Sequence, residues 1–335
     1  MVHHAFKDVE SIQSTEIKLL AESLPYVLIH GLADSTVTKY YSAWNKWLNW
    51  CKDKPEVQPR PAEPFFVAIY LNFLLRTVAK KGCISAAMYG IRWGHRIIGL
   101  PTPTNNSIVQ LAFEGCLRLC PGKTVKKEAL PVHVIKDLVD EYCRNKQNLM
   151  DLRFVVICLL GFAGFFRIDE VLSIQLKHLS FFPNYLLVTL EKSKTDQHRK
   201  GNEVFISVTE SEYCPVTYVK LFLQTTDSDC ELFPEAFLIP RLHKTKSGHS
   251  VSRTRGISYT TVYDIFKAKV TNAKPEHSKY CLHSLRSGGA SAAAKNGVSD
   301  RLIAKQGRWS TETARDGYIE DSVDYRLKPS SSLGL

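Results

Sequence analysis

Four side chains near the C-terminal end of the sequence have types and spacings suited to holding and attacking an anion. His283 and Arg286 are three residues apart, so on a helix both side chains leave the same face and can reach one anion. Trp309 and Tyr318 follow, nine residues apart. The indole offers one N–H donor, whereas a tyrosine hydroxyl becomes a good nucleophile only when nearby positive charge favours its phenolate or a base takes its proton.

The residues between these four predict three short helices joined by tight turns. The GGASAA segment that follows Arg286 carries little side-chain bulk, so another backbone can approach it closely. Stops and caps alternate along the chain: Asn296 with Gly297 as a stop, Ser299 as a cap, Gly307 as a stop, and Ser310 or Thr311 as a cap. Such an arrangement delivers a His, an Arg, a Trp and a Tyr to one pocket.

An arginine and an acid lie together earlier in the sequence. In GFAGFFRIDEVLSIQL an apolar run reaches Arg167, and Glu170 follows one helical turn later. Further on, YLLVTLEKSKTDQHRKGNEVFISV has two segments of alternating apolar residues on either side of a basic turn that holds Lys192 and Lys194. This pattern predicts two antiparallel strands joined as a hairpin.

This ordered set resembles the catalytic core of the tyrosine recombinases, the phage-integrase and Cre-like enzymes that break and rejoin DNA. The resemblance spans roughly residues 130 to 325. It implies a mainly α fold of two domains, in which a helical, SAM-like core-binding domain precedes a mixed α+β catalytic domain with a small antiparallel sheet. The catalytic residues that it implies are Arg167, Lys194, His283, Arg286, Trp309 and the nucleophile Tyr318, with Glu170 in support.

The chemistry implied by the resemblance is attack of Tyr318 on a DNA phosphodiester, which leaves a 3′-phosphotyrosyl bond and a free 5′ hydroxyl. Two guanidiniums, those of Arg167 and Arg286, remain charged and can hold the non-bridging oxygens from both sides. His283 is the candidate for exchanging the tyrosine proton. Lys194 is the candidate for giving a proton to the departing oxygen.

Three smaller assignments complete the implied site. Lys194 aligns with the lysine of the family better than Lys192 does. Trp309 can contact the phosphate through its N–H but cannot do acid or base work, and Glu170 orients Arg167. The mechanism needs no metal and no cofactor, and the sequence contains no evident Asp/Glu cluster for a metal.

The same resemblance divides the chain into four parts. These are an N-terminal arm (1–30), a helical core-binding domain (31–122), a basic linker (123–130) and a catalytic domain (131–335). About four helices are expected in the core-binding domain. Of these, FFVAIYLNFLL is apolar on every side, which is typical of a buried helix, and Ile108, Leu111, Ala112 and Leu119 are expected to form the buried side of another.

Composition favours a polyanionic partner. The net charge is +11 over 335 residues, and an excess of Lys and Arg on a folded chain attracts anions. The sequence has no long apolar segment and no signal-like start, so there is little support for a membrane protein. We expect an intracellular protein, nuclear in a eukaryotic host and otherwise cytoplasmic, whose nine cysteines are reduced thiols.

Double-stranded DNA is the expected partner, and the resemblance implies a homo-oligomer, a tetramer of protomers on two DNA sites. Basic residues in three regions are candidate phosphate contacts, although each can also be an ordinary solvated charge. The run 241–255 has five Lys and Arg and no acid, which is typical of a mobile loop. The candidates are Arg92, Arg96, Lys123, Lys126, Lys127, Lys244, Lys246, Arg253 and Arg255.

Two other functions remain open at this point. A type IB topoisomerase uses similar chemistry, but that family usually has Lys and His where this sequence has His283 and Trp309. The second alternative is a former recombinase retained only for binding DNA, against which the intact catalytic set argues. Tyr325 is a rival nucleophile, but it lies beyond the spacing at which the nucleophile is expected.

If the linker lysines contact phosphates, DNA binding should weaken steeply with salt. The double change Lys126→Ala and Lys127→Ala is expected to make the slope of log K against log salt less steep. The slope should change by nearly one unit for each lysine that binds a phosphate. Binding isotherms at several salt concentrations measure this slope. An unchanged slope in the double variant would make the linker an ordinary solvated segment.

Overall fold

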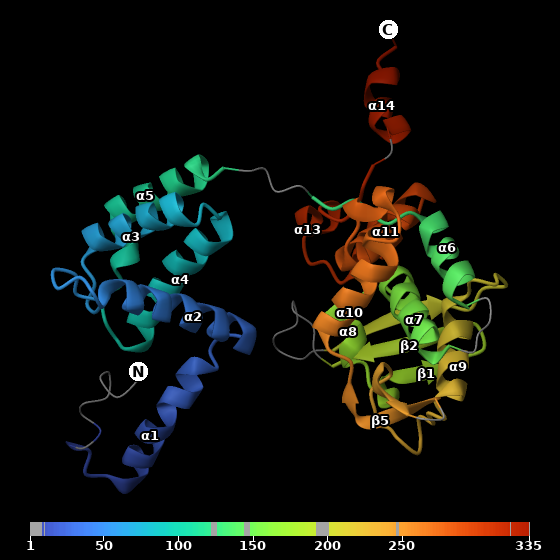
Figure 1. Cartoon of the computed structure of the whole chain (residues 1–335), viewed down its shortest axis with the longest axis horizontal. Coiled ribbons are helices and arrows are strands. Elements are labelled where there is room, and N and C mark those ends of the chain that lie inside the picture. The colour runs from blue at the N-terminus through green and yellow to red at the C-terminus, as the bar shows by residue number, and fades with distance from the viewer. Residues whose placement is uncertain are drawn as a thin grey trace. The chain divides into compact units, whose positions relative to one another are not determined.

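Helices make up most of both halves of the chain, and small antiparallel sheets lie in the second half, which confirms the predicted fold class (Figure 1). The computed structural model describes residues 9, 11–121, 126–143, 148–191, 201–245, 248–321 and 323–334. The chain divides into two compact units, residues 1–124 and 125–335. Among the described residues, no helix combines the length and the apolar character that crossing a membrane requires.

The first unit packs its helices around buried tryptophans. Its helices are α1 (Thr15–Ile29), α2 (Asp34–Cys51), α3 (Pro64–Thr77), α4 (Lys81–Ile97) and α5 (Ser107–Leu119). Trp44 and Trp47 of α2 are fully buried. Gly94 of α4 lies against Trp44, and a β-carbon at position 94 would be only 2.3 Å from the Trp44 ring. The close packing of α2 on α4 therefore depends on this glycine.

The prediction that the FFVAIYLNFLL helix is buried on every side is wrong. In α3, Val67 and Leu71 are fully buried, but Phe65, Ile69 and Phe73 are exposed. The helix thus covers the bundle with one face only. An apolar stretch of this length can be a core helix or a surface helix with an apolar outer face, and periodicity does not separate the two.

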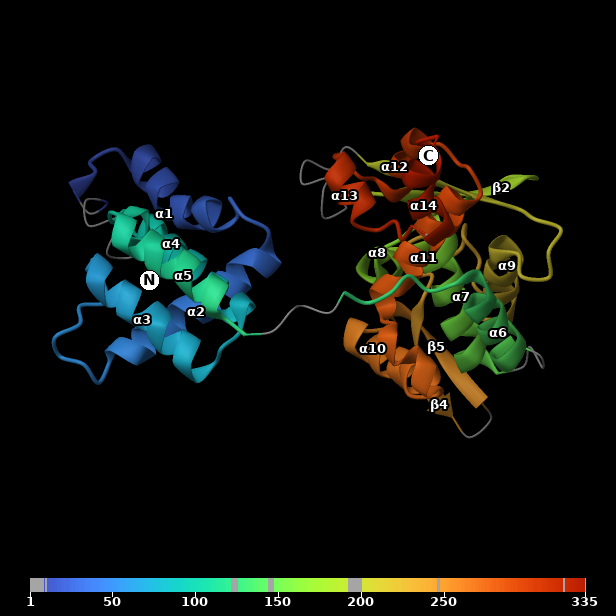
Figure 2. The ribbon, with the colours of Figure 1, turned by 90° about the horizontal axis from the view of Figure 1, so that it is seen from above.

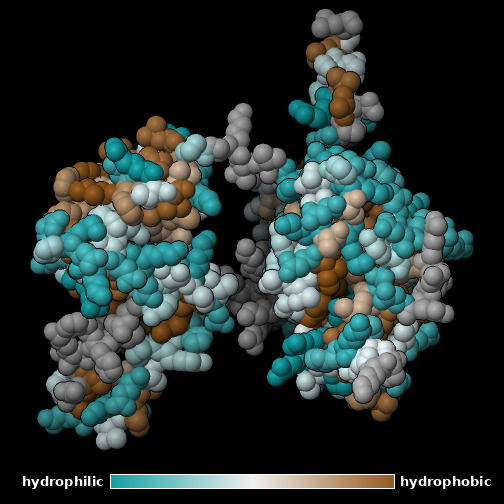
Figure 3. Space-filling model, in the orientation of Figure 1, coloured by the Kyte–Doolittle hydropathy of each residue, from teal (hydrophilic) through white to brown (hydrophobic). Residues whose placement is uncertain are grey.

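The predicted buried side of α5 is also wrong. Ile108, Leu111 and Leu119 are exposed, whereas Val109 and Cys116 on the neighbouring side of the helix are buried. Both sides of this helix carry apolar residues, so the sequence pattern alone selects the wrong one. As a result, exposed apolar side chains gather over α3 and α5 (Figure 3).

The second unit contains the remaining helices and all the paired strands of the two described sheets. Its helices are α6 (Val132–Cys143), α7 (Leu149–Ala163), α8 (Ile168–Ser173), α9 (Pro215–Thr225), α10 (Tyr259–Phe266), α11 (Leu282–Lys295), α12 (Asp300–Gly307), α13 (Glu312–Asp316) and α14 (Val323–Ser331). Its strands are β1 (Leu179–Phe181), β2 (Tyr185–Leu190), β3 (Asn202–Ser207), β4 (Pro240–Thr245) and β5 (Gly248–Gly256).

Helix α7 lies at the centre of this unit. The Asn148 side chain caps its start by accepting from the backbone N–H groups of Met150 and Asp151. Every residue from 152 to 161 is buried, and α7 contacts α6, α9 and α11 (Figure 2). A helix that is apolar on all sides belongs to the core. Its C-terminal end is therefore held firmly, and the chain reaches Arg167 four residues later.

The two sheets differ in how well their sequences predict them. β1, β2 and β3 pair antiparallel in that order, with Val188 of β2 opposite Val204 of β3, as the alternating pattern predicts. The hairpin turn that carries Lys192 and Lys194 lies outside the described residues. The prediction of a mobile loop at 241–255 is wrong, because β4 and β5 form an antiparallel pair there; their polar residues provide no alternating apolar signal.

Gly94→Ala is expected to destabilise the first unit by about 1–3 kcal/mol, because the buried Trp44 ring must move to admit the new methyl group. Gly115→Ala on α5 is the matched control. A β-carbon at position 115 meets open space, so the helix preference for alanine predicts a gain of about 0.5–1 kcal/mol. Urea unfolding of both variants measures the two changes, and equal effects would contradict the close packing of α4 on Trp44.

Candidate active site

Glu170 lies where the start of α8, the helix α11 and the end of α12 meet. Its carboxylate is 5% exposed. Oε1 accepts from Nη1 of Arg167 at 2.7 Å, and Oε2 accepts from Nη2 of Arg308 at 2.6 Å and from the Arg167 backbone N–H at 2.8 Å. Nη1 of Arg286 is 3.7 Å from Oε2. One carboxylate therefore lies among three guanidiniums, of which the resemblance implied two, those of Arg167 and Arg286.

Opposing effects act on the ionisation of this cluster. Burial favours a higher pKa for Glu170, but Arg308 and Arg167 favour a lower one, and the net shift of the pKa is downward. Burial, followed by the neighbouring charges of Arg167 and Arg308, lowers the pKa of Arg286 to about 9. Arg286 is still protonated at neutral pH. The cluster therefore carries more positive than negative charge and favours an anion.

Arg286 is held between backbone carbonyls and aromatic rings. Its side chain is 0% exposed, and it donates from Nη1 to the Phe165 carbonyl and from Nη2 to the Gly307 carbonyl. Its central carbon lies 4.7 Å from the centre of the Trp309 ring and 4.9 Å from that of the Tyr318 ring. The position of this guanidinium is thus determined by the protein before any ligand binds.

His283 and Tyr318 are in direct contact. Nε2 of His283 lies 3.0 Å from the Tyr318 hydroxyl oxygen, and the Trp309 and Tyr318 rings are 4.9 Å apart between centres. Within the part of the chain that the structure describes, the buried Nε1 of Trp309 has no hydrogen-bond partner. The structure thus brings the four C-terminal candidates to one place, beside Arg167 and Glu170.

Two adjacent glycines of α11 make this convergence possible. A β-carbon at Gly288 would lie 2.1 Å from the Leu130 carbonyl oxygen, and one at Gly289 would lie 2.0 Å from the Phe162 carbonyl oxygen. The Leu130 N–H also donates to the Ser284 carbonyl at 2.9 Å. The small side chains after Arg286 therefore allow close backbone approach, as predicted.

Helix α12 ends at Gly307, as predicted, but Gly307 does not supply the left-handed turn. The residue in the left-handed conformation is Arg308, with φ of 55° and ψ of 42°. Gly307 is required for another reason, because a β-carbon there would lie 2.1 Å from the Trp309 ring. The sequence offered only a weak signal that Arg308 belongs to the site, namely a basic residue between a glycine and a tryptophan. Its burial was not expected, because charged residues normally lie at the surface.

The segment that precedes α6 is tied to the segment that follows Tyr318. The Ala129 backbone N–H donates to Oε2 of Glu320 at 2.8 Å, and the Glu320 backbone N–H donates to Oγ of Ser291 at 2.8 Å. Ser291 in turn donates to the Tyr318 carbonyl at 3.4 Å. A polar hollow of about 160 Å³ is lined here by Lys126, Lys127, Glu128, Ala129, Ser287, Tyr318 and Glu320.

The candidate phosphate contacts are spread over both units. Lys123, Lys194 and Lys246 lie outside the described residues. Arg96 on α4 and Lys126, Lys244 and Arg255 in the second unit are exposed. Lys127 is also exposed, and its Nζ donates to the Ser278 carbonyl at 2.8 Å.

Two of the candidate arginines are engaged with their own chain. Nε of Arg92 donates to Oγ1 of Thr104 at 2.9 Å. Arg253 donates to Oγ of Ser228 and to the Asp227 carbonyl, at 2.8 and 2.7 Å. These bonds use the donors of Arg253 to hold β5 on the turn after α9.

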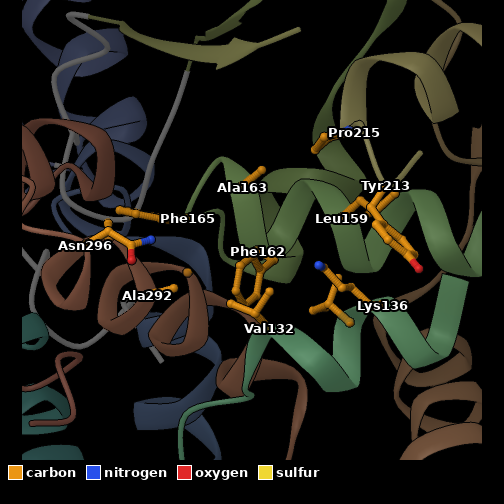
Figure 4. A pocket seen from close by; sticks show the side chains of 13 residues that line it. Val132, Lys136, Leu159, Phe162, Ala163, Phe165, Tyr213, Pro215, Ala292 and Asn296 are labelled. Atoms are coloured by element: carbon orange, nitrogen blue, oxygen red, sulfur yellow. The ribbon is translucent and has the colours of Figure 1, made fainter. Parts of the chain in front are cut away.

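A larger, apolar cavity of about 340 Å³ lies between α6, α7 and α11 (Figure 4). Val132, Leu159, Phe162 and Ala292 line it, and Lys136 stands at its side. None of the side chains proposed to act in the reaction lines it. In the described ranges, no group of three His, Cys, Asp or Glu side chains could hold a metal ion.

Known proteins resemble this chain in both sequence and fold. Residues 128–323 match the model of the Phage integrase family. The chain is similar to the integrase/recombinase XerD homolog of Selenomonas ruminantium, with 27% identity over 302 residues that cover 86% of this chain and 82% of that protein. It is also similar to recombinase Cre of Escherichia phage P1, with 24% identity over 301 residues, 87% of this chain and 85% of that protein.

The fold resembles that of a solved structure, a lambda integrase (75–356) dimer bound to a COC′ core site. The TM-score is 0.55 at 14% sequence identity, and the match covers 90% of this chain and 94% of that one. The likeness therefore extends over both units of the chain.

Glu170→Gln is expected to destabilise the second unit by about 3–5 kcal/mol at neutral pH, as when one partner is removed from a buried ion pair. The pKa of Glu170 is lower in the folded protein than its ordinary value of 4.5. Its charge therefore stabilises the fold above pH 4.5, and this stabilisation is lost as the pH falls through the folded-state pKa.

Urea unfolding at several pH values should show the difference between wild type and Glu170→Gln shrinking below pH 4.5. Asp169→Asn changes the exposed neighbouring carboxylate and is the matched control, with a small effect at every pH. A Glu170→Gln protein as stable as wild type at pH 7 would contradict the central role of this carboxylate.

Proposed function

The chain belongs to the phage integrase family, and from this membership and the cluster around Glu170 we propose that it is a site-specific recombinase of mobile-element type. In this proposal it cleaves and rejoins double-stranded DNA through a covalent tyrosine intermediate. The observation that carries the proposal is the 3.0 Å contact between His283 and the Tyr318 hydroxyl, directly beside the guanidinium of Arg286. The family match and the DNA-bound lambda integrase of similar fold support it.

The arginine cluster fits a phosphodiester in its charge and in its donors. Attack on phosphorus places negative charge on the non-bridging oxygens, and fixed guanidiniums stabilise such charge most effectively in a site that is already organised. Glu170 and two backbone carbonyls hold Arg167 and Arg286 in place. The Trp309 N–H, which has no partner among the described residues, is a further donor for a phosphate oxygen.

In the proposed step, the Tyr318 oxygen attacks phosphorus and forms a phosphotyrosyl bond with the 3′ side of the broken strand. The bond between phosphorus and the 5′ oxygen breaks, and the electron pair leaves with that oxygen. His283 takes the hydroxyl proton of Tyr318. Lys194, which lies outside the described residues, is the proposed donor of the proton that makes the departing oxygen a 5′ hydroxyl.

This intermediate retains the energy of the original ester. A 5′ hydroxyl from a second DNA end can attack the phosphotyrosyl bond, re-form a phosphodiester and return Tyr318 to its starting state. The exchange needs no nucleotide cofactor and no metal, because its charge stabilisation comes from arginine. Strand exchange between two sites therefore requires only that two cleaved ends come together.

We assign DNA contacts to both parts of the chain. Residues 31–122 form the proposed core-binding domain, with Arg96 exposed on α4, and residues 123–130 form the basic linker to the catalytic domain, 131–335. Lys126 and Lys127 line the hollow beside Tyr318, where a strand at the active site would pass. Arg253 is removed from the proposed contacts because its donors bind its own chain.

Assembly of several protomers is supported by apolar surfaces of the second unit. Val323 and Leu327 of α14 are exposed, and the apolar cavity between α6 and α11 offers a matching surface. We propose that α14 of one copy occupies this cavity in a second copy. A tetramer of protomers on two DNA sites is the assembly that strand exchange requires.

Tyr318→Phe is expected to abolish covalent attachment to DNA while sparing folding and binding, because it removes one oxygen and keeps the ring that packs on Trp309 and Arg286. Tyr325→Phe is the matched control and should keep the adduct. The assay incubates the protein with labelled nicked targets from a randomised library in EDTA, then denatures it and looks for labelled protein.

Two results would count against this proposal. An adduct with Tyr318→Phe would mean that another residue is the nucleophile. The lack of any adduct with the wild-type protein, on every target in the library, would favour a protein that only binds DNA.

A further inference from the structure

The backbone at Arg308 adopts a conformation that suits glycine better than arginine. Its φ of 55° and ψ of 42° lie in the left-handed region, where a β-carbon is crowded and glycine is not. The residue caps the C-terminal end of α12, the position at which glycine is most often found. An arginine here suggests a use for the side chain that offsets the backbone strain.

The side chain of Arg308 turns inward and binds four oxygen atoms. The residue is 8% exposed. Nη1 donates to the carbonyls of Gly164 at 3.2 Å and Gln306 at 2.7 Å. Nη2 donates to the Phe165 carbonyl at 3.0 Å and to Oε2 of Glu170 at 2.6 Å. Only a planar fork of donors can meet so many acceptors at once.

Two of these acceptors also bind the proposed phosphate-binding arginines. Glu170 accepts from Arg167 through Oε1, and the Phe165 carbonyl accepts from Arg286. Arg308 therefore contacts the groups that hold Arg167 and Arg286, from the side of α12. Within the described residues, its own hydrogen bonds go to this framework and not to Tyr318.

The distances around Glu170 indicate what this third arginine changes. Arg308 occupies Oε2 at 2.6 Å, whereas Nη1 of Arg286 remains 3.7 Å away, which is beyond hydrogen-bond length. A buried carboxylate oxygen forms strong hydrogen bonds with the nearest guanidinium donors. Without Arg308, Oε2 would be open to Arg286, and a guanidinium engaged in that way has fewer donors for a phosphate.

We propose that Arg308 is a positioning residue of the active site, which occupies the Glu170 carboxylate and the Phe165 carbonyl so that Arg167 and Arg286 stay aligned for the phosphate. This inference rests on the proposed function, since it concerns the rate of the tyrosine reaction. Arg308 acts through Glu170 and the turn at residues 164–166. It has no direct role in the chemical step.

The test uses three substitutions at position 308. Arg308→Gly removes the side chain and relieves the left-handed strain, Arg308→Met keeps the length without the charge, and Arg308→Lys keeps the charge without the fork. Arg301→Met, which changes an exposed arginine of the same helix, is the matched control. The full-length proteins are compared in single-turnover cleavage of a nicked duplex that traps the adduct, with thermal unfolding and DNA affinity measured alongside.

Arg308→Gly and Arg308→Met are expected to slow adduct formation by about tenfold to a hundredfold, as for a small misplacement of catalytic groups. Arg308→Lys should recover part of this loss, and Arg301→Met should react at the wild-type rate. DNA affinity should stay within a few-fold of wild type in all four. Combined with Glu170→Gln, Arg308→Gly should cost much less than it does alone, because the carboxylate through which it acts is gone.

Different results would overturn the inference in different ways. Wild-type cleavage rates in both Arg308→Gly and Arg308→Met would refute it and leave the proposed function intact. A loss of rate matched by an equal loss of DNA affinity or of folded protein would indicate a merely structural residue. Full additivity with Glu170→Gln would show that Arg308 does not act through that carboxylate. No adduct with wild type on any target would overturn the proposed function and, with it, this inference.

Discussion

The structure of the second unit depends on one buried carboxylate that holds three guanidiniums together. Like charges brought this close repel one another unless a counter-ion lies among them, and Glu170 is that counter-ion for Arg167, Arg286 and Arg308. Its hydrogen bonds go to Arg167 and Arg308, and Arg286 lies beyond hydrogen-bond distance. The arginine at 3.7 Å remains attracted without being fully engaged, and this inequality gives the site its capacity for a further anion.

Packing of the helices brings these charged side chains together and restricts their movement. The buried helix α7 fixes the turn that leads to Arg167, and the glycine pair of α11 lets the backbone before α6 and the end of α7 approach within contact distance. Two backbone carbonyls bind Arg286. Because the donors are buried and lie on rigid elements, the site has its geometry before an anion binds. Little reorganisation is therefore needed on binding.

Part of this arrangement could be predicted from local spacing in the sequence, whereas the meeting of Arg167 and Glu170 with the C-terminal residues was implied by the resemblance to the family. His283 and Arg286 share a face since they are one turn apart, and the β2–β3 pairing follows from alternation of apolar residues. Arg308 could not be predicted, because a buried charge depends on partners far away in the sequence, and its left-handed backbone contradicts the preference for glycine. The exposed face of α3 and the buried face of α5 were not predicted, because each helix is apolar on more than one side and only tertiary packing decides which side is covered.

The hydrogen bond from Ala129 to Glu320 joins the entrance of the second unit to the segment that carries Tyr318. Any displacement of the chain at residue 129 must break this bond or move Glu320, which is two residues beyond the hydroxyl-bearing tyrosine. The next residue, Leu130, donates its backbone N–H to the Ser284 carbonyl of α11, the helix that carries His283 and Arg286. A shift of the chain at residues 129–130 therefore acts on both sides of the candidate site at once, on the Tyr318 segment through Glu320 and on the helix of His283 and Arg286 through Ser284.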